Sequence, residues 1–447
     1  VVTVKIKLYY NISNNIQSYL YKYLQSSSTS ERNNDTFNGE NRMIKLLGGA
    51  SLLAMSLATA AIASEHHDDN VTLYRVFVGD HDAPRVTAFD LNAPKNHWTF
   101  NTIGQTKLYS VADNSVIVAV QSDHDQVNFI QSGFHTHNHG DHADIEIHDP
   151  KAVKASIQGP RPFHVIDHGN RVSINFDKGG YASVLDNAEL AKGTIKETQI
   201  RQKHAHHGIV VPWDDNWLSS IASDEAEEGH APPRIGLQNV SSDGTPTGDL
   251  QTCTGLHGEA FSGTYLAVGC EEGVLVAKSG KNETQYKMLP YPSNFPKGEM
   301  SGTLKGAKSF QVFLASYGAK SLAIIDPTAS PYMQLVELPF RRIDFILDPV
   351  KIQNAYVLTE DGQIHRINLI SGEIEDSARI TKPYSMDGHW NDPRPRLAMA
   401  GDEIIMTDPI AGLVRRISTT DFSEIGTIDV EGAPYNITVV GGSGISH

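Results

Sequence analysis

The sequence has few cysteines, few positive charges and no long apolar segment. It contains 2 Cys in 447 residues, and 37 Lys and Arg stand against 52 Asp and Glu, which gives a formal net charge of −15. An acidic chain without a basic run is unsuited to binding the phosphate backbone of nucleic acids. No apolar stretch reaches the roughly 20 residues of a membrane-spanning helix. Hydrophobic residues still make up 39% of the chain, enough for a large folded core.

The N-terminal region has the order of segments that is typical of a secretory signal peptide. A short basic start is followed by an apolar stretch over residues 46–60 and by the small-residue sequence Ala61-Ile62-Ala63. We predict a signal peptide over residues 43–63, cleaved near Ala63-Ser64, and export without a membrane anchor. Residues 1–42 are rich in Ser, Asn and Tyr, and we expect them to be a mis-called or disordered extension.

Export bears on Cys253 and Cys270, the two cysteines of the chain. An oxidising compartment favours disulfide formation, so we predict that these two residues are bonded to each other. The alternative is a pair of separate buried thiols.

Helix signals are nearly absent from residue 64 onward. Short runs rich in Val, Ile, Tyr and Phe recur every 8 to 12 residues between Gly, Asp, Asn and Pro, which is typical of an all-β protein. Similar groups of strands recur at roughly 40 to 50 residues, which indicates the four-stranded blades of a β-propeller. We therefore predict an all-β chain with a single β-propeller domain over residues 71–447.

The two ends of this domain complement each other. The first strand group, over residues 72–102, contains only three expected strands, and the last apolar run, Tyr435 to Val440, has no strands after it. The N- and C-terminal strands are expected to complete one blade together and so to close the ring. Counting that blade once favours eight blades, with seven as the alternative because the boundaries between residues 204 and 300 are loose.

Histidine is the over-represented residue. Of the 20 histidines, 11 lie between His124 and His207, and residues 135–142 contain four of them together with an aspartate. Neutral imidazoles and carboxylates at such spacing suit Zn²⁺, whereas the alternative is a solvated loop without a ligand. The expected metal ligands of this loop are His135, His137, His139, Asp141 and His142.

A second group of histidines is dispersed in the sequence. In a propeller, the start of each innermost strand and the turn between the second and third strands of a blade lie on one face, around the central channel. Histidines at such positions are expected to converge on a metal ion, with Asp123, Asp167 or Asp214 as carboxylate ligands or hydrogen-bond partners. For each one, an ordinary hydrogen-bonded histidine is the alternative. The histidines of this group are His124, His164, His168, His204, His206, His207, His257 and His389.

The segment that follows the predicted cleavage site, residues 64–70, contains His66, His67 and Asp68. A flexible terminus of this composition can capture a metal ion or hand it on, and the alternative is a solvated tail.

Residues 137–142 also fit the His-x-His-x-Asp-His pattern of metallo-β-lactamase-type hydrolases, in which such residues support a metal-activated water. In that family the pattern ends a buried strand and enters a helix, but here residues 143–148 predict another strand. A zinc-dependent hydrolase is therefore the runner-up hypothesis. A propeller that binds a protein or ligand, with incidental histidines, is a further alternative.

The signal peptide, the histidine-led N-terminus, the propeller pattern and the loop from His135 to His142 running into Ala143-Asp144-Ile145 together resemble the periplasmic zinc metallochaperone AztD family. The resemblance extends over residues 64–447. It implies a non-enzymatic, monomeric propeller that binds Zn²⁺ in the periplasm and passes it directly to the zinc-specific solute-binding protein of an ABC importer. It does not assign the histidines to particular zinc sites.

Overall fold

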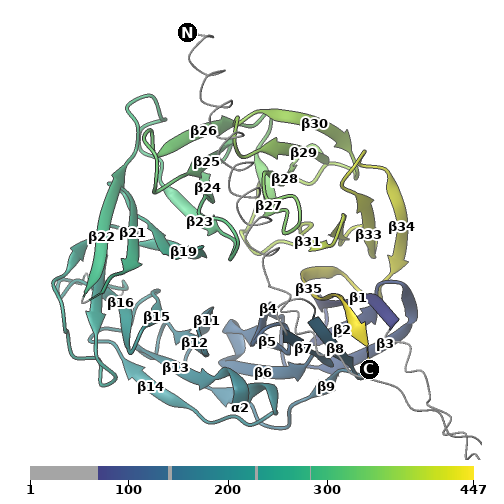
Figure 1. Cartoon of the computed structure of the whole chain (residues 1–447), viewed down its shortest axis with the longest axis horizontal. Coiled ribbons are helices and arrows are strands. Elements are labelled where there is room, and N and C mark those ends of the chain that lie inside the picture. The colour runs from purple at the N-terminus through teal and green to yellow at the C-terminus, as the bar shows by residue number, and fades with distance from the viewer. Residues whose placement is uncertain (1–68, 139–142, 227–229, 282, 447) are drawn as a thin grey trace, which may run out of the picture. The chain divides into compact units, whose positions relative to one another are not determined.

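The computed structural model describes residues 69–138, 143–226, 230–281 and 283–446. The predicted signal peptide, the extension before it and residues 64–68 lie outside this part of the chain. Within it, eight β-sheets are arranged as blades around a common axis (Figure 1). The prediction of an all-β propeller with eight blades is therefore confirmed. None of the helices described is long and apolar enough to cross a membrane.

The strands of each blade run outward from the axis in sequence order, except in the first blade. Blade 1 consists of β35 (Pro434–Ser446), β1 (Asp69–Asp80), β2 (Arg85–Asp90) and β3 (Ala93–Asn101). Blade 2 consists of β4 (Lys107–Val111), β5 (Val116–Gln121) and β6 (Gln126–Gln131), with the short β9 (Lys151–Ala152) and β10 (Ile157–Gln158) outside β6. Blades 3 and 4 consist of β11 (Pro162–His168), β12 (Arg171–Phe176), β13 (Tyr181–Asp186) and β14 (Thr198–Arg201), then β15 (Val210–Trp213), β16 (Asn216–Ala222), β17 (Arg234–Val240) and β18 (Gln251–Thr252).

The second half of the ring has the same plan. Blades 5 and 6 consist of β19 (His257–Ser262), β20 (Tyr265–Gly269), β21 (Gly273–Ser279) and β22 (Thr284–Pro290), then β23 (Ser301–Lys305), β24 (Phe313–Tyr317), β25 (Ser321–Ile325) and β26 (Met333–Glu337). Blades 7 and 8 consist of β27 (Arg342–Leu347), β28 (Asn354–Thr359), β29 (Gln363–Asn368) and β30 (Ile374–Arg379), then β31 (Leu397–Ala400), β32 (Glu403–Asp408), β33 (Leu413–Ser418) and β34 (Glu424–Asp429). A short helix, α2 (Asn187–Ala191), connects β13 to β14.

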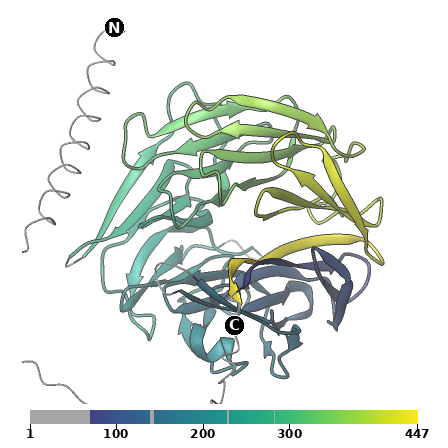
Figure 2. The same ribbon diagram turned by 45° about the vertical axis from the view of Figure 1, so that its right-hand side comes forward.

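The ring is closed by the two ends of the described chain. β1 and β35 are antiparallel along most of their length, with Arg75 opposite Val440 and Phe77 opposite Thr438. Figure 2 shows the yellow C-terminal strand beside the purple N-terminal strands. The prediction that the N- and C-terminal strands complete one blade is therefore confirmed.

The burial of each strand follows its place in the blade. The second strand of a blade packs between neighbouring blades on both faces, so β5 and β28 are buried at every position. The outermost strands alternate between exposed and less exposed positions, as in β30 and β34. This difference explains why continuous apolar runs and alternating patterns recur together within each repeat.

The two cysteines form the predicted disulfide, Cys253–Cys270. Cys253 follows β18 of blade 4 and Cys270 follows β20 of blade 5, and both residues are buried in one apolar cluster. The bond therefore joins the end of blade 4 to the second strand of blade 5.

The histidine-rich segment belongs to an added hairpin between β6 and β9. Its strands are β7 (Phe134–Asn138) and β8 (Ala143–Ile147), and Phe134 and Ile145 pack into the core. Arg75 holds the base of this hairpin. Its guanidinium donates to the carbonyl oxygens of Ser132 and His148, each at 2.7 Å.

Arg75 is almost fully buried and is paired with the Asp90 carboxylate at 2.8 Å. Its guanidinium also lies 4.5 Å from the centre of the Trp98 ring. The buried guanidinium thus joins blade 1 to the hairpin by donating hydrogen bonds to one carboxylate and two carbonyl oxygens. Removing it would leave these three acceptors without their hydrogen-bond donor.

We expect Arg75→Ala to lower the free energy of unfolding by about 3–5 kcal/mol, because Asp90 is left as an unpaired buried charge. The double variant Arg75→Met, Asp90→Leu should lose less, since it removes both charges and keeps the apolar volume. Denaturant unfolding followed by tryptophan fluorescence measures both variants. A loss below 1 kcal/mol in Arg75→Ala would show that the buried pair is not needed.

A buried histidine in blade 7 makes stability depend on pH. The two ring nitrogens of His365 bond to Thr359 Oγ1 at 3.0 Å and to Ser377 Oγ at 2.6 Å, and burial lowers the pKa of this histidine. On unfolding, His365 returns to its ordinary pKa near 6.5. The unfolded chain therefore binds the additional proton in mild acid, and stability falls as the pH drops below that value.

We expect His365→Gln to reduce the slope of the unfolding free energy against pH between pH 7 and 5, by at most ~1.4 kcal/mol per pH unit. His97 on β3 is exposed, so His97→Gln is the matched control and should leave the slope unchanged. Denaturant unfolding at several pH values measures these slopes. Equal slopes for His365→Gln and the unmodified protein would contradict the assignment.

Candidate metal centre

Three histidines from adjacent blades meet at the face of the ring where the innermost strands begin. His164 lies on β11, His207 lies in the loop between β14 and β15, and His257 is the first residue of β19. The centres of the His164 and His207 rings are 4.8 Å apart, and those of His207 and His257 are 5.5 Å apart. The propeller thus assembles one histidine from each of blades 3, 4 and 5, here called the histidine triad.

Each ring of the histidine triad is oriented through its Nδ1 atom. His207 Nδ1 lies 2.7 Å from Asp177 Oδ2, and His164 Nδ1 lies 3.2 Å from the Glu259 carboxylate. His257 Nδ1 lies 2.9 Å from the carbonyl oxygen of Gly302. Because carboxylates and carbonyls only accept hydrogen bonds, we infer that each Nδ1 carries the hydrogen and each Nε2 has a free lone pair. This tautomer is the one required for metal ligation through Nε2.

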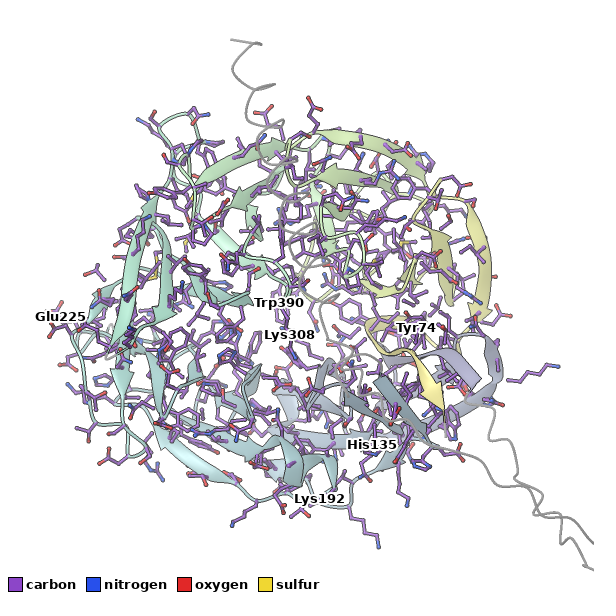
Figure 3. All side chains as sticks on the ribbon, viewed as in Figure 1. Tyr74, His135, Lys192, Glu225, Lys308 and Trp390 are labelled. Carbon is purple, nitrogen blue, oxygen red and sulfur yellow. A yellow bond between two sulfur atoms is a disulfide. The ribbon has the colours of Figure 1, made fainter. Side chains whose placement is uncertain are left out.

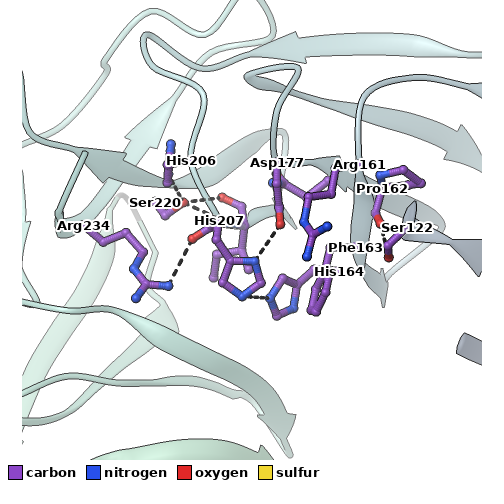
Figure 4. A network of polar contacts seen from close by, with 12 residues as sticks. Ser122, Arg161, Pro162, Phe163, His164, Asp177, His206, His207, Ser220 and Arg234 are labelled. Atoms are coloured by element: carbon purple, nitrogen blue, oxygen red, sulfur yellow. Dashed lines mark hydrogen bonds and ion pairs between the residues drawn. The ribbon is translucent and has the colours of Figure 1, made fainter. Parts of the chain in front are cut away.

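The two closest Nε2 atoms have the spacing of a metal site. Figure 4 shows His164 and His207 facing each other, and their Nε2 atoms are 3.3 Å apart. Two nitrogens bound to one tetrahedral Zn²⁺ at the usual bond length are separated by about 3.3 Å. Two lone pairs at this distance repel each other, and either a proton or a metal ion between them removes the repulsion.

The third histidine does not yet converge with the other two. In the described part of the chain, no group of three or more His, Cys, Asp or Glu side chains is already placed to hold a metal ion. A four-coordinate site would therefore need His257 to turn toward the His164–His207 pair. Burial is the main cause of the lowered pKa of His257, which favours the neutral, ligating form of this imidazole.

The carboxyl group that holds His164 is buried beside it. Burial raises the pKa of Glu259, but the electrostatic interaction and hydrogen bond with His164, together with Lys107 and His207, lower it by more, so the pKa is lowered overall. The second carboxylate, that of Asp177, is only 6% exposed and lies against His207. Two largely buried carboxylates therefore supply negative charge beside the three imidazoles.

β-Bulges set the direction of these side chains. The register of β11 against β12 shifts between Pro162 and Val165, and that of β19 against β20 shifts between His257 and Glu259. In β19 the shift is centred on Gly258, whose φ of +70° places it where other residues are strained. A Cβ atom there would come within 2.0 Å of the Gly302 carbonyl oxygen. The bulges re-aim His164, His257 and Glu259 away from ordinary alternation.

An aromatic ring covers one side of the site. The Phe163 ring makes an edge contact with His207 at 4.6 Å between centres and lies 5.3 Å from His164. Arg234 donates to the backbone carbonyl of His207 at 3.3 Å (Figure 4). Phe163 and Arg234 therefore flank the group, which hydrogen bonds orient.

The structure places His206 and His204 outside this group. His206 is 2% exposed, and its ring bonds to the His204 carbonyl and to Ser220 Oγ, each at 2.8 Å. His204 Nε2 lies 2.6 Å from Asp224 on the surface. These contacts order the loop that positions His207.

Three more of the histidines predicted as ligands contact residues other than those of the histidine triad. His168 ends β11, four residues and roughly 13 Å along the strand from His164, and it stacks on Phe261 with ring centres 3.6 Å apart. His124 packs against Gly104 in the short 3-10 turn after β5. His389 is exposed in the loop before β31, where its Nδ1 accepts from the Asn391 backbone at 3.2 Å.

The carboxylates suggested by the sequence have other partners. Asp123 pairs with Arg161 at 3.1 Å, and Asp214 accepts from Ser279 at 2.6 Å. Asp167 accepts from the Ala112 backbone at 2.8 Å, and burial raises its pKa.

Asp177 and Glu259 hold the histidines instead, and sequence reasoning missed both. Asp177 lies in the turn between the second and third strands of blade 3, the turn that the propeller rule indicates. Glu259 lies two residues after His257, but its direction depends on the bulge.

The histidine-rich loop connects the two antiparallel strands of the β7–β8 hairpin, so a strand and not a helix follows it. This is the order expected from the sequence, and it differs from that of the hydrolase pattern. The side chain of His135 is half-buried, and its ring centre lies 6.3 Å from that of His148. His139, Asp141 and His142 lie outside the described residues, as do His66, His67 and Asp68.

The fold and the triad define a β-propeller with a candidate transition-metal centre at one face. No family model matches the sequence. The chain is 38% identical over 409 residues to the zinc chaperone AztD of Citrobacter koseri, covering 91% of this chain and 96% of that protein. It therefore belongs to the AztD zinc chaperone family.

Solved structures agree with this assignment. The crystal structure of Citrobacter koseri AztD has a TM-score of 0.80 and 38% identity, covering 84% of this chain and all of that one. Its apo form has a TM-score of 0.78 and 37% identity, covering 84% and 99% of the two chains. The dihydro-heme d1 dehydrogenase NirN, at 11% identity and a TM-score of 0.52, covers 83% of this chain and 75% of its own and shares the fold alone.

Proposed function

We propose that this chain is a periplasmic zinc chaperone that binds Zn²⁺ as cargo at the histidine triad. The observation that supports it most is the His164–His207 pair, whose Nε2 atoms stand 3.3 Å apart with both Nδ1 atoms held by carboxylates. The name of the relative from Citrobacter koseri, zinc chaperone, supports the same metal. His257 is the proposed third ligand, and a water molecule or a transient ligand completes the tetrahedron.

The site is suited to exchange as well as to binding. The carboxylates of Asp177 and Glu259 make the imidazoles better donors, which stabilises the bound ion. Because His257 must turn toward the His164–His207 pair, its bond to the ion can form or break while the other two histidines stay in place. A carrier can then pass its ion by replacing one ligand at a time.

We further propose that the histidine-rich hairpin collects Zn²⁺ for the triad. His135, His137, His139, Asp141 and His142 are the proposed ligands there, and His66, His67 and Asp68 are proposed to act in the same way. The proposed recipient is the zinc-specific solute-binding protein of an ABC importer. Carriage of the ion, and not turnover of a substrate, is the activity that this arrangement supports.

The binding site is tested by removing its two closest ligands. The variant His164→Ala, His207→Ala should lose at least about 100-fold in zinc affinity, because the two nitrogens that the described residues place at ligand spacing are gone. Competition with a chromophoric chelator measures the affinity of the mature protein without a histidine tag.

His389→Ala is the matched control, since His389 is exposed and does not contact the triad. It should bind Zn²⁺ as the unmodified protein does. Unchanged affinity in the double variant would place the zinc site elsewhere and overturn this part of the proposal.

The chaperone role is tested by the rate of transfer. Zinc-loaded protein mixed with a zinc-binding periplasmic solute-binding protein should lose its ion at a rate that rises with the concentration of that protein, because ligands are exchanged within a complex. With a small chelator, the same loss should be limited by spontaneous dissociation and be slower. Equal rates that do not depend on either acceptor would indicate storage or release, and not direct transfer.

A further inference from the structure

A lysine stands beside the proposed zinc site. Lys107 is the first residue of β4, the innermost strand of blade 2, next to the blade that carries His164 (Figure 1). Its Nζ atom lies 5.0 Å from the centre of the Phe163 ring and 5.2 Å from that of Tyr109. Tyr109 in turn donates to the Phe163 carbonyl at 3.2 Å. The ammonium is thus held over aromatic rings.

The position of this ammonium relative to the triad follows from the shared ring. Phe163 contacts His207 at 4.6 Å and Lys107 at 5.0 Å from the same ring centre, so the positive charge lies within about 10 Å of the His207 imidazole. Its charge also reaches Glu259, where it contributes to the lowered pKa of that carboxyl. Burial lowers the pKa of Lys107, but Tyr109 and the Glu259 carboxylate raise it by more, so the pKa is raised overall and the amine stays charged at every pH at which histidines bind zinc.

A fixed positive charge beside a cation-binding site lowers the affinity for the cation, so binding alone does not explain its presence. Arg161, which also faces Phe163 at 6.0 Å, is paired with Asp123 at 3.1 Å. Lys107 instead has no ion-pair partner among the described residues; it hydrogen-bonds to the Tyr109 hydroxyl, lies against the Phe163 ring and faces the Glu259 carboxylate, which the proposed zinc site also uses. Its repulsion acts when Zn²⁺ is present and vanishes when the ion leaves.

We propose that Lys107 tunes the zinc affinity of the triad by charge repulsion and so promotes release of the ion to an acceptor. This inference rests on the proposed function, since it concerns the same site. Lys107 is not a ligand. It acts through the electrostatic potential at the site. That potential must be negative enough to bind Zn²⁺ tightly, yet not so negative that the ion cannot be exchanged.

The test is Lys107→Met, which keeps an unbranched side chain against the rings and removes the charge. A unit charge acting on a divalent ion at about 10 Å changes affinity by about 4-fold at an effective dielectric constant of ~80 and by about 17-fold at ~40. We therefore expect Lys107→Met to bind Zn²⁺ about 4- to 17-fold more tightly. Its ion should be lost to a chelator more slowly by a similar factor, and the difference should shrink at high ionic strength.

Two variants separate charge from shape and from net charge. Lys107→Arg keeps the cation over the rings and should bind like the unmodified protein. Lys192→Met makes the same change in net charge at the remote helix α2, where Lys192 pairs with Glu189 at the periphery (Figure 3), and should leave affinity unchanged. Thermal unfolding of all variants checks that the fold is retained.

The outcomes distinguish the two proposals. If the unmodified protein binds no stoichiometric Zn²⁺, the proposed function fails. If it binds Zn²⁺ and Lys107→Met stays within twofold of it, the role of Lys107 alone is overturned. The same conclusion follows if Lys107→Arg behaves like Lys107→Met, because shape and not charge would then account for the effect.

Discussion

The closure of the ring by β1 and β35 is the constraint on which the other features of this protein depend. A propeller blade buries its faces only against its neighbours, so an open array would leave two apolar faces in water. Pairing of the N- and C-terminal strands fixes the blades around one axis. Only then do the starts of β11, β15 and β19 lie side by side, so that their histidines share one face.

Within this frame, departures from regular β-structure create the site. The bulges at the starts of β11 and β19 interrupt the alternation of side chains exactly where His164, His257 and Glu259 occur. Asp177, Glu259 and the Gly302 carbonyl then settle the tautomers of three imidazoles. Backbone irregularity and hydrogen bonding therefore prepare the proposed metal site, and the remaining adjustment is a rotation of the His257 ring.

Charge is balanced at this site in a way that suits a carrier. Two carboxylates hold the imidazoles and would attract a cation at the proposed site, and we propose that Lys107, 5.0 Å from the centre of the Phe163 ring, opposes it. A storage site would gain from removing that lysine, whereas a site that passes its ion onward gains from keeping it. The acidic chain adds a general attraction for cations that acts over longer distances.

The sequence by itself predicted the fold class, the closure of the ring and the disulfide, and it favoured eight blades over seven. These follow from local patterns: turn residues, apolar periodicity, and two cysteines in a chain with a predicted export signal. It also pointed to the histidines as the chemistry of the protein. The sequence placed His164, His207 and His257 on one face of the propeller, the face where the innermost strands begin, because strand order determines which loops lie on the same face.

Only the tertiary structure decided which residues meet. His164 is 43 residues from His207 and 95 from Glu259, so no local pattern relates them. His168 shares a strand with His164 but lies too far along it, and His206 is directed into the core beside Ser220. The physical reason is register: a shift of one residue turns a side chain to the opposite face of a strand. Bulges introduce such shifts through long-range contacts that the sequence does not display.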